Sequence, residues 1–372
     1  MIGIHAFLHC CASAFACCRV TPTVPRGRTI PGISACVHFC VSLTVPRGRA
    51  MICILALLHF CVSLAIPSAA SAGDRYALII SGASGGPQYA QRYQALRKSL
   101  LATLRQKFGY ADDHLIILSE APEAGVRGAT RDNVRAALGE LRRRAAKDDV
   151  VLVFLVGHGT TLDSDDGKFN LVGPDLTGDQ WASLIKPIAG RMVFVNTTGG
   201  SFPFLHRIAG PGRVVVTATN SVAQQFDTVF PEFFVRAFDD PSADLDKNGK
   251  VSIWEAFNYA SAAVKAWFEE RGQLATERPL LDDTGGGIGR EAGSPGTDGA
   301  LAQVTYLQPD AAIPPTADTE LARLLKQRTE LESALDLLRA SKSNVPPDQY
   351  EAELERLLLE LARLDRQIRT RS

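Results

Sequence analysis

Cysteine is missing from most of this chain. All eight cysteines lie before residue 62, and none occurs in the rest of the sequence. Removal of an N-terminal leader would therefore leave a mature protein with neither a thiol nor a disulfide. This absence excludes a disulfide-stapled scaffold, and it excludes a cysteine nucleophile anywhere after residue 61.

The chain also lacks net charge, but the charge is unevenly distributed. Its 372 residues carry 40 basic and 40 acidic side chains. Residues 1–72 contain five arginines, no lysine and no acid, so the remaining chain has 35 basic and 40 acidic residues. A mildly acidic body gives no electrostatic support for nucleic-acid binding. A hydrophobic content of 46% excludes a mainly disordered chain.

A short apolar run near the N-terminus has the order of features of a secretory signal peptide. Residues 51–66 are apolar and follow Arg47 and Arg49, and Ala70-Ser71-Ala72 supplies a small-residue cleavage site before Gly73. The run is shorter than the about 20 residues that span a membrane. We therefore predict a signal peptide over 51–72, a secreted or periplasmic protein, and no stable membrane span after cleavage. The alternative is an uncleaved anchor.

The segment before this run is a repeat. TVPRGR occurs at 23–28 and 44–49, and HFCVSL occurs at 38–43 and 59–64. A second leader is not needed for export, so we expect translation to begin at Met51, with 1–50 as an upstream duplicate.

Residues 73–290 alternate between strand and helix patterns. Strands are predicted at Tyr76–Ser81, His114–Leu118, Val150–Val156, Met192–Val195 and Arg213–Thr219, and helices at 89–108, 130–145, 177–186 and 230–238. The continuous apolar run VVLVFLV at 150–156 is typical of a central parallel strand. This alternation predicts a doubly wound α/β sheet with helices on both faces, which binds ligands beyond the carboxyl ends of its strands.

One predicted strand ends in His158-Gly159, and a later one ends in a Thr-Thr-Gly-Gly-Ser turn. These two strand ends resemble those of the caspase-like cysteine peptidases, the clan of caspases and legumains. The segments at 130–138 and 226–234 also resemble bacterial members of this group. The resemblance covers about 75–290. It implies a caspase-like sheet, with His158 as a base and the Gly159 N–H as a donor to an oxyanion.

The chain departs from this family at the nucleophile. Thr197 or Thr198 stands where the family has cysteine, and a threonine hydroxyl is not appreciably ionised at neutral pH. We therefore expect a pseudo-peptidase that serves binding or scaffolding. The alternative is an active hydrolase that uses His158 with one of these threonines. In a further alternative, the histidine and both threonines only satisfy nearby backbone groups.

A second acidic cluster lies within the same region. Asp163, Asp165 and Asp166 precede Gly167, and the Asp-Gly pair predicts a turn that joins two short strands. A metal site is the less favoured interpretation, since the spacing matches no closed ligand set.

The sharpest motif is a calcium loop at 244–255. Its sequence, DLDKNGKVSIWE, matches the EF-hand pattern at every specified position. The predicted ligands are Asp244, Asp246, Asn248, the Lys250 carbonyl, Ser252 and Glu255. The predicted helix at 230–238 would enter the loop, and another over 254–270 would leave it. The alternative is an Asp-rich turn that binds no ion.

No second EF-hand is visible to pair with this loop. Residues 281–289 resemble a loop whose later acidic ligands are missing. A lone loop diluted by two lysines should bind Ca²⁺ with a Kd of about 10⁻⁴–10⁻³ M, as extracellular modules do. That favours a structural ion over a signalling switch.

The C-terminal region predicts a linker and a helical arm. Residues 291–318 are rich in Gly, Ala and Pro. Within 319–372, leucines recur at intervals of three and four in two series that Pro346-Pro347 separates. This spacing predicts an antiparallel helical hairpin or coiled coil. Three roles stay open: packing on its own domain, self-association, or binding a protein partner.

Overall fold

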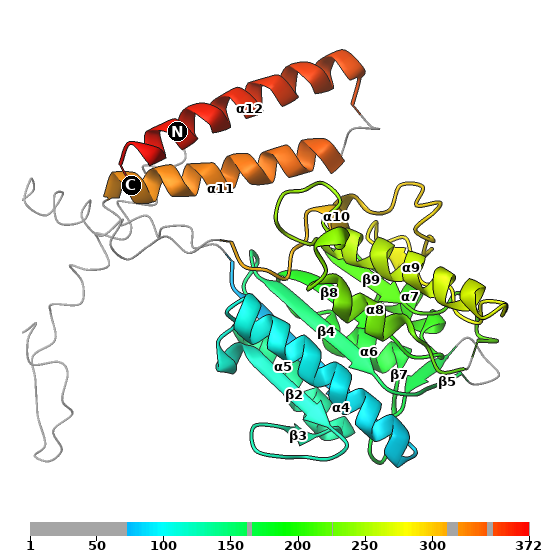
Figure 1. Ribbon diagram of the computed structural model, residues 1–372. Coiled ribbons are helices and arrows are strands. Elements are labelled where there is room, and N and C mark those ends of the chain that lie inside the picture. The colour runs from blue at the N-terminus through cyan, green and yellow to red at the C-terminus, as the bar shows by residue number, and fades with distance from the viewer. Residues whose placement is uncertain (1–72, 162–165, 225, 311–318, 341–344, 372) are drawn as a thin grey trace, which may run out of the picture. The chain divides into compact units, whose positions relative to one another are not determined.

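The computed structural model describes residues 73–161, 166–224, 226–310, 319–340 and 345–371 (Figure 1). The predicted leader and signal peptide, 1–72, therefore lie outside the described residues. So do Asp163 and Asp165 of the second acidic cluster, and residues 311–318 of the predicted linker. No helix in the described part of the chain is long and apolar enough to cross a membrane.

A seven-stranded sheet forms the centre of the α/β domain. Its strand order is β10-β9-β8-β4-β1-β2-β3. The bounds are Arg75–Ser81 for β1, Leu115–Ser119 for β2, Arg127–Gly128 for β3, Val150–Val156 for β4, Arg191–Asn196 for β8, Arg213–Thr217 for β9 and Leu280–Asp282 for β10. All neighbours pair in parallel except β9 and β10, which are antiparallel.

Helices cover both faces of this sheet, as the alternating pattern predicted. One apolar core joins the sheet to α4 (Pro87–Ala102), α8 (Phe230–Ala237) and α9 (Ile253–Glu270). The other core joins it to α5 (Arg131–Arg144), α6 (Gly178–Ile185) and α7 (Phe202–Ile208). Every residue of β4 is buried, because both faces of this central strand are covered. The doubly wound α/β class is therefore confirmed.

The chain reverses its direction of winding at the centre of the sheet. From β1 it passes to β2 on one side, and later returns to place β4 on the other side of β1. The carboxyl ends of β1 and β4 therefore form the switch point at which open α/β sheets bind ligands.

The start of helix α5 is fixed by the local sequence. The hydroxyl of its N-cap residue, Thr130, accepts a hydrogen bond from the Asn133 N–H, as N-cap residues do.

A small antiparallel sheet follows β4. It consists of β5 (Gly159–Thr161), β6 (Gly167–Phe169) and β7 (Leu176–Thr177). Strands β5 and β6 are the two short strands expected around Asp166-Gly167, but Gly167 of the predicted turn is itself the first residue of β6, paired with Thr161.

Most predicted elements shift by one or two residues at their ends, and some short helical turns were not predicted. The helix predicted to run to residue 108 is α4, followed by a π-helical turn over Thr103–Lys107. A 3₁₀ turn, Pro241–Ala243, lies between α8 and the calcium loop. The first part of the predicted linker contains a short helix, α10 (Ala300–Gln303), and Leu307 beyond it is fully buried.

The C-terminal helices form the expected hairpin. Helices α11 (Thr319–Ala340) and α12 (Pro347–Arg369) lie side by side and antiparallel (Figure 1). Leu324, Leu364 and Ile368 form its apolar core. An ion pair of 3.2 Å between Arg328 Nε and Asp365 Oδ1 joins the two helices. Arg328, which interrupts the leucine series, therefore faces an acidic partner across the hairpin.

Candidate functional site

His158 lies at the switch point of the sheet. It follows β4 directly, and its Nε2 is 2.9 Å from the carbonyl oxygen of Ser84, in the loop that follows β1. A carbonyl oxygen can only accept, so Nε2 carries the proton of this hydrogen bond. The pairing of β1 with β4 brings these two loops together, although 74 residues separate them.

The other nitrogen of His158 faces an acid. Its Nδ1 is 3.2 Å from Oδ1 of Asp227, in the segment that precedes α8. The rings of Tyr89 and Tyr93, both on α4, meet the imidazole edge-on at centroid distances of 4.8 and 5.7 Å. Both side chains of this ion pair are about one-third exposed, at 29% for His158 and 33% for Asp227. The imidazole is thus held on three sides and remains open to solvent.

Asp227 also acts on the neighbouring phenols. Its hydrogen bond with Tyr89 raises the pKa of that phenol, and its charge adds to the effect. Burial, followed by the charge of Asp227, raises the pKa of Tyr93. Both phenols are therefore protonated at neutral pH, and neither is a candidate base.

Thr198 is the threonine that lies beside the His158-Gly159 turn. A Cβ atom placed on Gly159 would come within 2.5 Å of the Thr198 hydroxyl oxygen. That hydroxyl donates to Oδ1 of Asn196 at 2.9 Å, and the Thr198 N–H donates to the same atom at 3.1 Å. Thr197 has a different environment, because its hydroxyl donates to the Leu155 carbonyl of β4 at 2.8 Å. Of the two candidate threonines, Thr198 is therefore the one beside the His158-Gly159 turn.

The histidine and the threonines are close in the fold but are not chemically paired. Within the described residues, no hydrogen bond joins His158 to Thr197 or Thr198, and both threonines are about 1% exposed. General-base activation needs a ring nitrogen within hydrogen-bond reach of the hydroxyl. Here Nε2 faces Ser84 and Nδ1 faces Asp227, so this arrangement presents neither nitrogen to a nucleophile.

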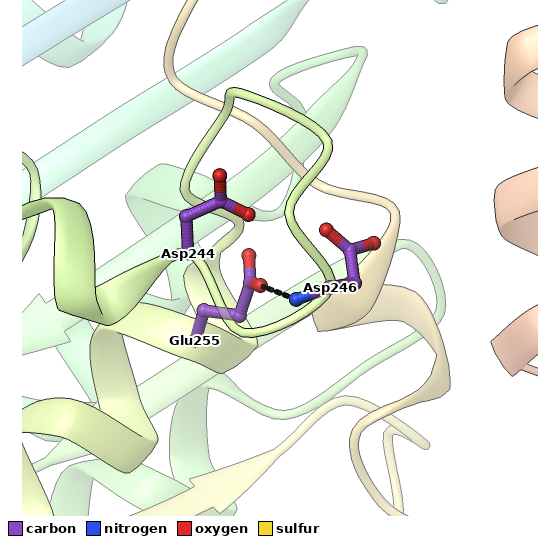
Figure 2. A group of neighbouring side chains, drawn as sticks. All are labelled: Asp244, Asp246 and Glu255. Carbon is purple, nitrogen blue, oxygen red and sulfur yellow. Dashed lines mark hydrogen bonds between the residues drawn. The ribbon is translucent and has the colours of Figure 1, made fainter.

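The loop at 244–255, predicted to bind calcium, forms a second candidate site. Carboxylate oxygens of Asp244, Asp246 and Glu255 lie within 4.8 Å of one another, and Figure 2 shows these side chains gathered at the loop. Gly249, at the sixth position, has a φ of 83°, the left-handed conformation that the sharp turn requires. Lys247 also has a positive φ, of 60°. The loop backbone therefore bends where the motif predicts.

Glu255 links this loop to helix α9. Its Oε1 accepts from the Leu245 N–H at 2.8 Å and the Asp246 N–H at 3.3 Å. Its Oε2 accepts from the Ser252 N–H, while the Ser252 hydroxyl caps the Glu255 N–H in return. This reciprocal capping box explains why α9 begins at Ile253. Carboxylate and carbonyl oxygens are the ligands that Ca²⁺ takes, so the residue types fit this ion.

The other predicted ligands occupy the same loop, but its surroundings differ from a paired EF-hand. Asn248 Oδ1 accepts from the Lys250 N–H at 2.8 Å, and the Lys250 ammonium pairs with Asp310 at 3.2 Å. Ser252 forms an isolated antiparallel bridge with Tyr306, and the Ile253 N–H donates to the Thr305 carbonyl. The segment after α10 is thus joined to the end of this loop by a β-bridge.

The acidic residues at 281–289 have a structural role. Asp282 is fully buried, and its carboxylate accepts from Thr284, Gly285 and Gly287. Asp283 accepts from the Gly299 and Ala302 N–H groups, each at 2.8 Å, at the start of α10. These carboxylates accept hydrogen bonds from backbone N–H groups, and buried polar groups need such partners.

Asp227 is the functional residue that sequence reasoning missed. It lies 69 positions after His158, in a segment that marked the family resemblance but has no motif of its own. An acid near a helix start is common, so its spacing alone carried no signal.

No protein-family model matches the chain, and no curated protein matches its sequence. Among solved structures, it is similar to protein GSU0716 from Geobacter sulfurreducens, with 14% identity and a TM-score of 0.37 over 56% of this chain and 92% of that one. It is also similar to the caspase drICE, with 12% identity and a TM-score of 0.32 over 56% of this chain and 87% of that one.

Proposed function

We propose that this chain is an exported, calcium-binding protein whose caspase-like domain has lost cysteine-peptidase activity and serves binding or scaffolding. One observation carries the proposal. Thr198 occupies the position beside His158-Gly159, where the family has its nucleophile, and no cysteine follows residue 61.

The environment of the imidazole supports this loss. A peptidase histidine takes a proton from its nucleophile, which requires a free ring nitrogen directed at that group. Both nitrogens of His158 face acceptors, and the Thr198 hydroxyl bonds to Asn196 instead. His158 and Thr198 therefore form separate hydrogen bonds, which favours a binding role over a catalytic pair.

The active-hydrolase alternative requires a rearrangement of the same residues. Thr198 would have to release Asn196, and His158 would have to turn one nitrogen away from Ser84 or Asp227. Thr197 is the weaker candidate, because its hydroxyl bonds to the backbone of β4.

A peptide-turnover assay tests the proposal. We expect the purified protein, with and without Ca²⁺, to cleave a mixed peptide library no faster than the His158→Ala variant does. Turnover by the wild type that disappears in His158→Ala would establish the hydrolase instead.

A further inference from the structure

A polar cleft lies beside the His158 site, at the carboxyl ends of β1 and β2. Its volume is about 340 Å³, and one flank of α4 forms a wall. Ser84 and Tyr93, which contact His158, also line it. This volume falls near the lower end of the roughly 300–1,000 Å³ of small-molecule sites. A ligand here would be small.

Two buried polar groups in this cleft are left without partners. Arg97 is 3% exposed, and its Nη2 donates to Glu123 Oε1 at 2.8 Å. Its Nη1 has no hydrogen-bond partner among the described residues, and neither has the hydroxyl of Ser81, which is also 3% exposed. A buried donor without an acceptor destabilises the fold. Ser81 and Arg97 are both among the residues that line the cleft, so a ligand oxygen that reaches these two buried atoms would satisfy them.

The more exposed part of the cleft carries the opposite charge. Glu120 accepts from the Ser84 N–H at 3.1 Å through Oε2 alone, and the Glu123 side chain is 52% exposed. Both glutamates line the cleft with Arg97. The site therefore combines buried donors for an anionic group with outer carboxylates for a cationic one. A guanidinium matches a carboxylate, and a glutamate matches an ammonium.

We propose that this cleft binds a free α-amino acid, with its carboxylate at Arg97 and Ser81 and its ammonium toward Glu120 and Glu123. The zwitterion supplies both charges within one small molecule. A residue inside a peptide offers neither backbone charge. This site does not depend on the proposed loss of peptidase activity, because it uses neither Thr198 nor the ring nitrogens of His158.

Calorimetry on the full chain tests the site. Each common L-amino acid is first screened at millimolar concentration by thermal shift, and the strongest is titrated into wild type, Ser81→Ala and Arg97→Lys. We expect Arg97→Lys, which keeps the charge but loses the planar fork, to weaken binding by about tenfold or more. Ser81→Ala should weaken it by about threefold to tenfold. Lys98→Met is the matched control, since Lys98 lies on the same helix but is exposed.

Blocked ligands separate the zwitterion from its parts. We expect the N-acetyl derivative, the amide and the doubly blocked amino acid each to bind about tenfold more weakly or worse. Three results would overturn the proposal: no binding of any free amino acid, equal binding of the doubly blocked form, or unchanged binding in Ser81→Ala and Arg97→Lys. If Arg97→Lys does not fold, Ser81→Ala and the blocked ligands decide.

Discussion

At the scale of single residues, the candidate site depends on which partner each polar atom has. The Thr198 hydroxyl and N–H share Oδ1 of Asn196, while His158 divides its nitrogens between Ser84 and Asp227. A cysteine thiol would ionise far more readily at this position than the threonine hydroxyl does. The replacement of a thiol by a secondary hydroxyl therefore accounts for the proposed change of function.

Glu277 is a second residue whose surroundings predict a measurable effect. It is 2% exposed, and it accepts from the N–H groups of Val229 and Phe230 at the start of α8. Burial raises the pKa of its carboxyl to about 7, although those hydrogen bonds lower it. The carboxyl of an unfolded glutamate has a pKa of about 4.3.

We predict that Glu277 makes the protein less stable as pH rises through this window. Between about pH 4.3 and 7 the folded state keeps a proton that the unfolded chain has lost, so the free energy of unfolding falls by up to about 4 kcal/mol and then levels off. Urea denaturation at several pH values measures the slope. Glu277→Gln, which cannot ionise, should lose this part of the dependence. Parallel pH profiles for the two proteins would refute the assignment.

At the scale of elements, we predict that Ca²⁺ binding to the loop at 244–255 stabilises the folded protein. Ca²⁺ that binds only the folded state, at one hundred times Kd, adds about 2.7 kcal/mol of stability. In a domain of this size that is a rise in Tm of about 5–10 °C. We expect calorimetry to show this rise in the wild type.

The matched variant for this experiment is Glu255→Gln. Glutamine can keep the capping box with Ser252 but loses the bidentate carboxylate, so α9 should persist while the calcium-dependent rise disappears. Glu269→Gln changes an exposed acid on the same helix and should leave the rise intact. If Ca²⁺ does not raise the Tm of the wild type, the proposal that this loop binds calcium is wrong.

The elements show what sequence patterns can and cannot predict. The bounds of β4 were predicted from its apolar run, and the start of α5 from Thr130 as an N-cap, because both are local signals. Asp227 and the Arg97 cleft depend on which strand ends become neighbours, and local patterns carry little of that information. The choice between Thr197 and Thr198 needed the side-chain directions at the end of β8.

At the scale of the whole molecule, the predicted processing site coincides with a tight contact at the start of the domain. A Cβ atom on Gly73 would lie 1.8 Å from the carbonyl oxygen of Asp148, so only glycine fits there. Next to it, the Asp74 N–H donates to Asp149 Oδ1 at 2.8 Å. Gly73 therefore fixes where the strand β1 enters the sheet.

We predict that the exported protein begins at Gly73. Intact-mass measurement and N-terminal sequencing of protein recovered from a secreting bacterial host would show a start directly after Ala72. An N-terminus far from Gly73 would contradict the signal peptide, and with it the export that the proposed function includes.

The most direct measurement of the central claim uses a fluorophosphonate, which forms a covalent bond with activated hydroxyl nucleophiles. The account predicts that the intact mass of the folded wild-type protein is unchanged after incubation, because neither ring nitrogen of His158 faces the Thr198 hydroxyl. A stoichiometric adduct at Thr197 or Thr198 that the His158→Ala variant fails to form would contradict it.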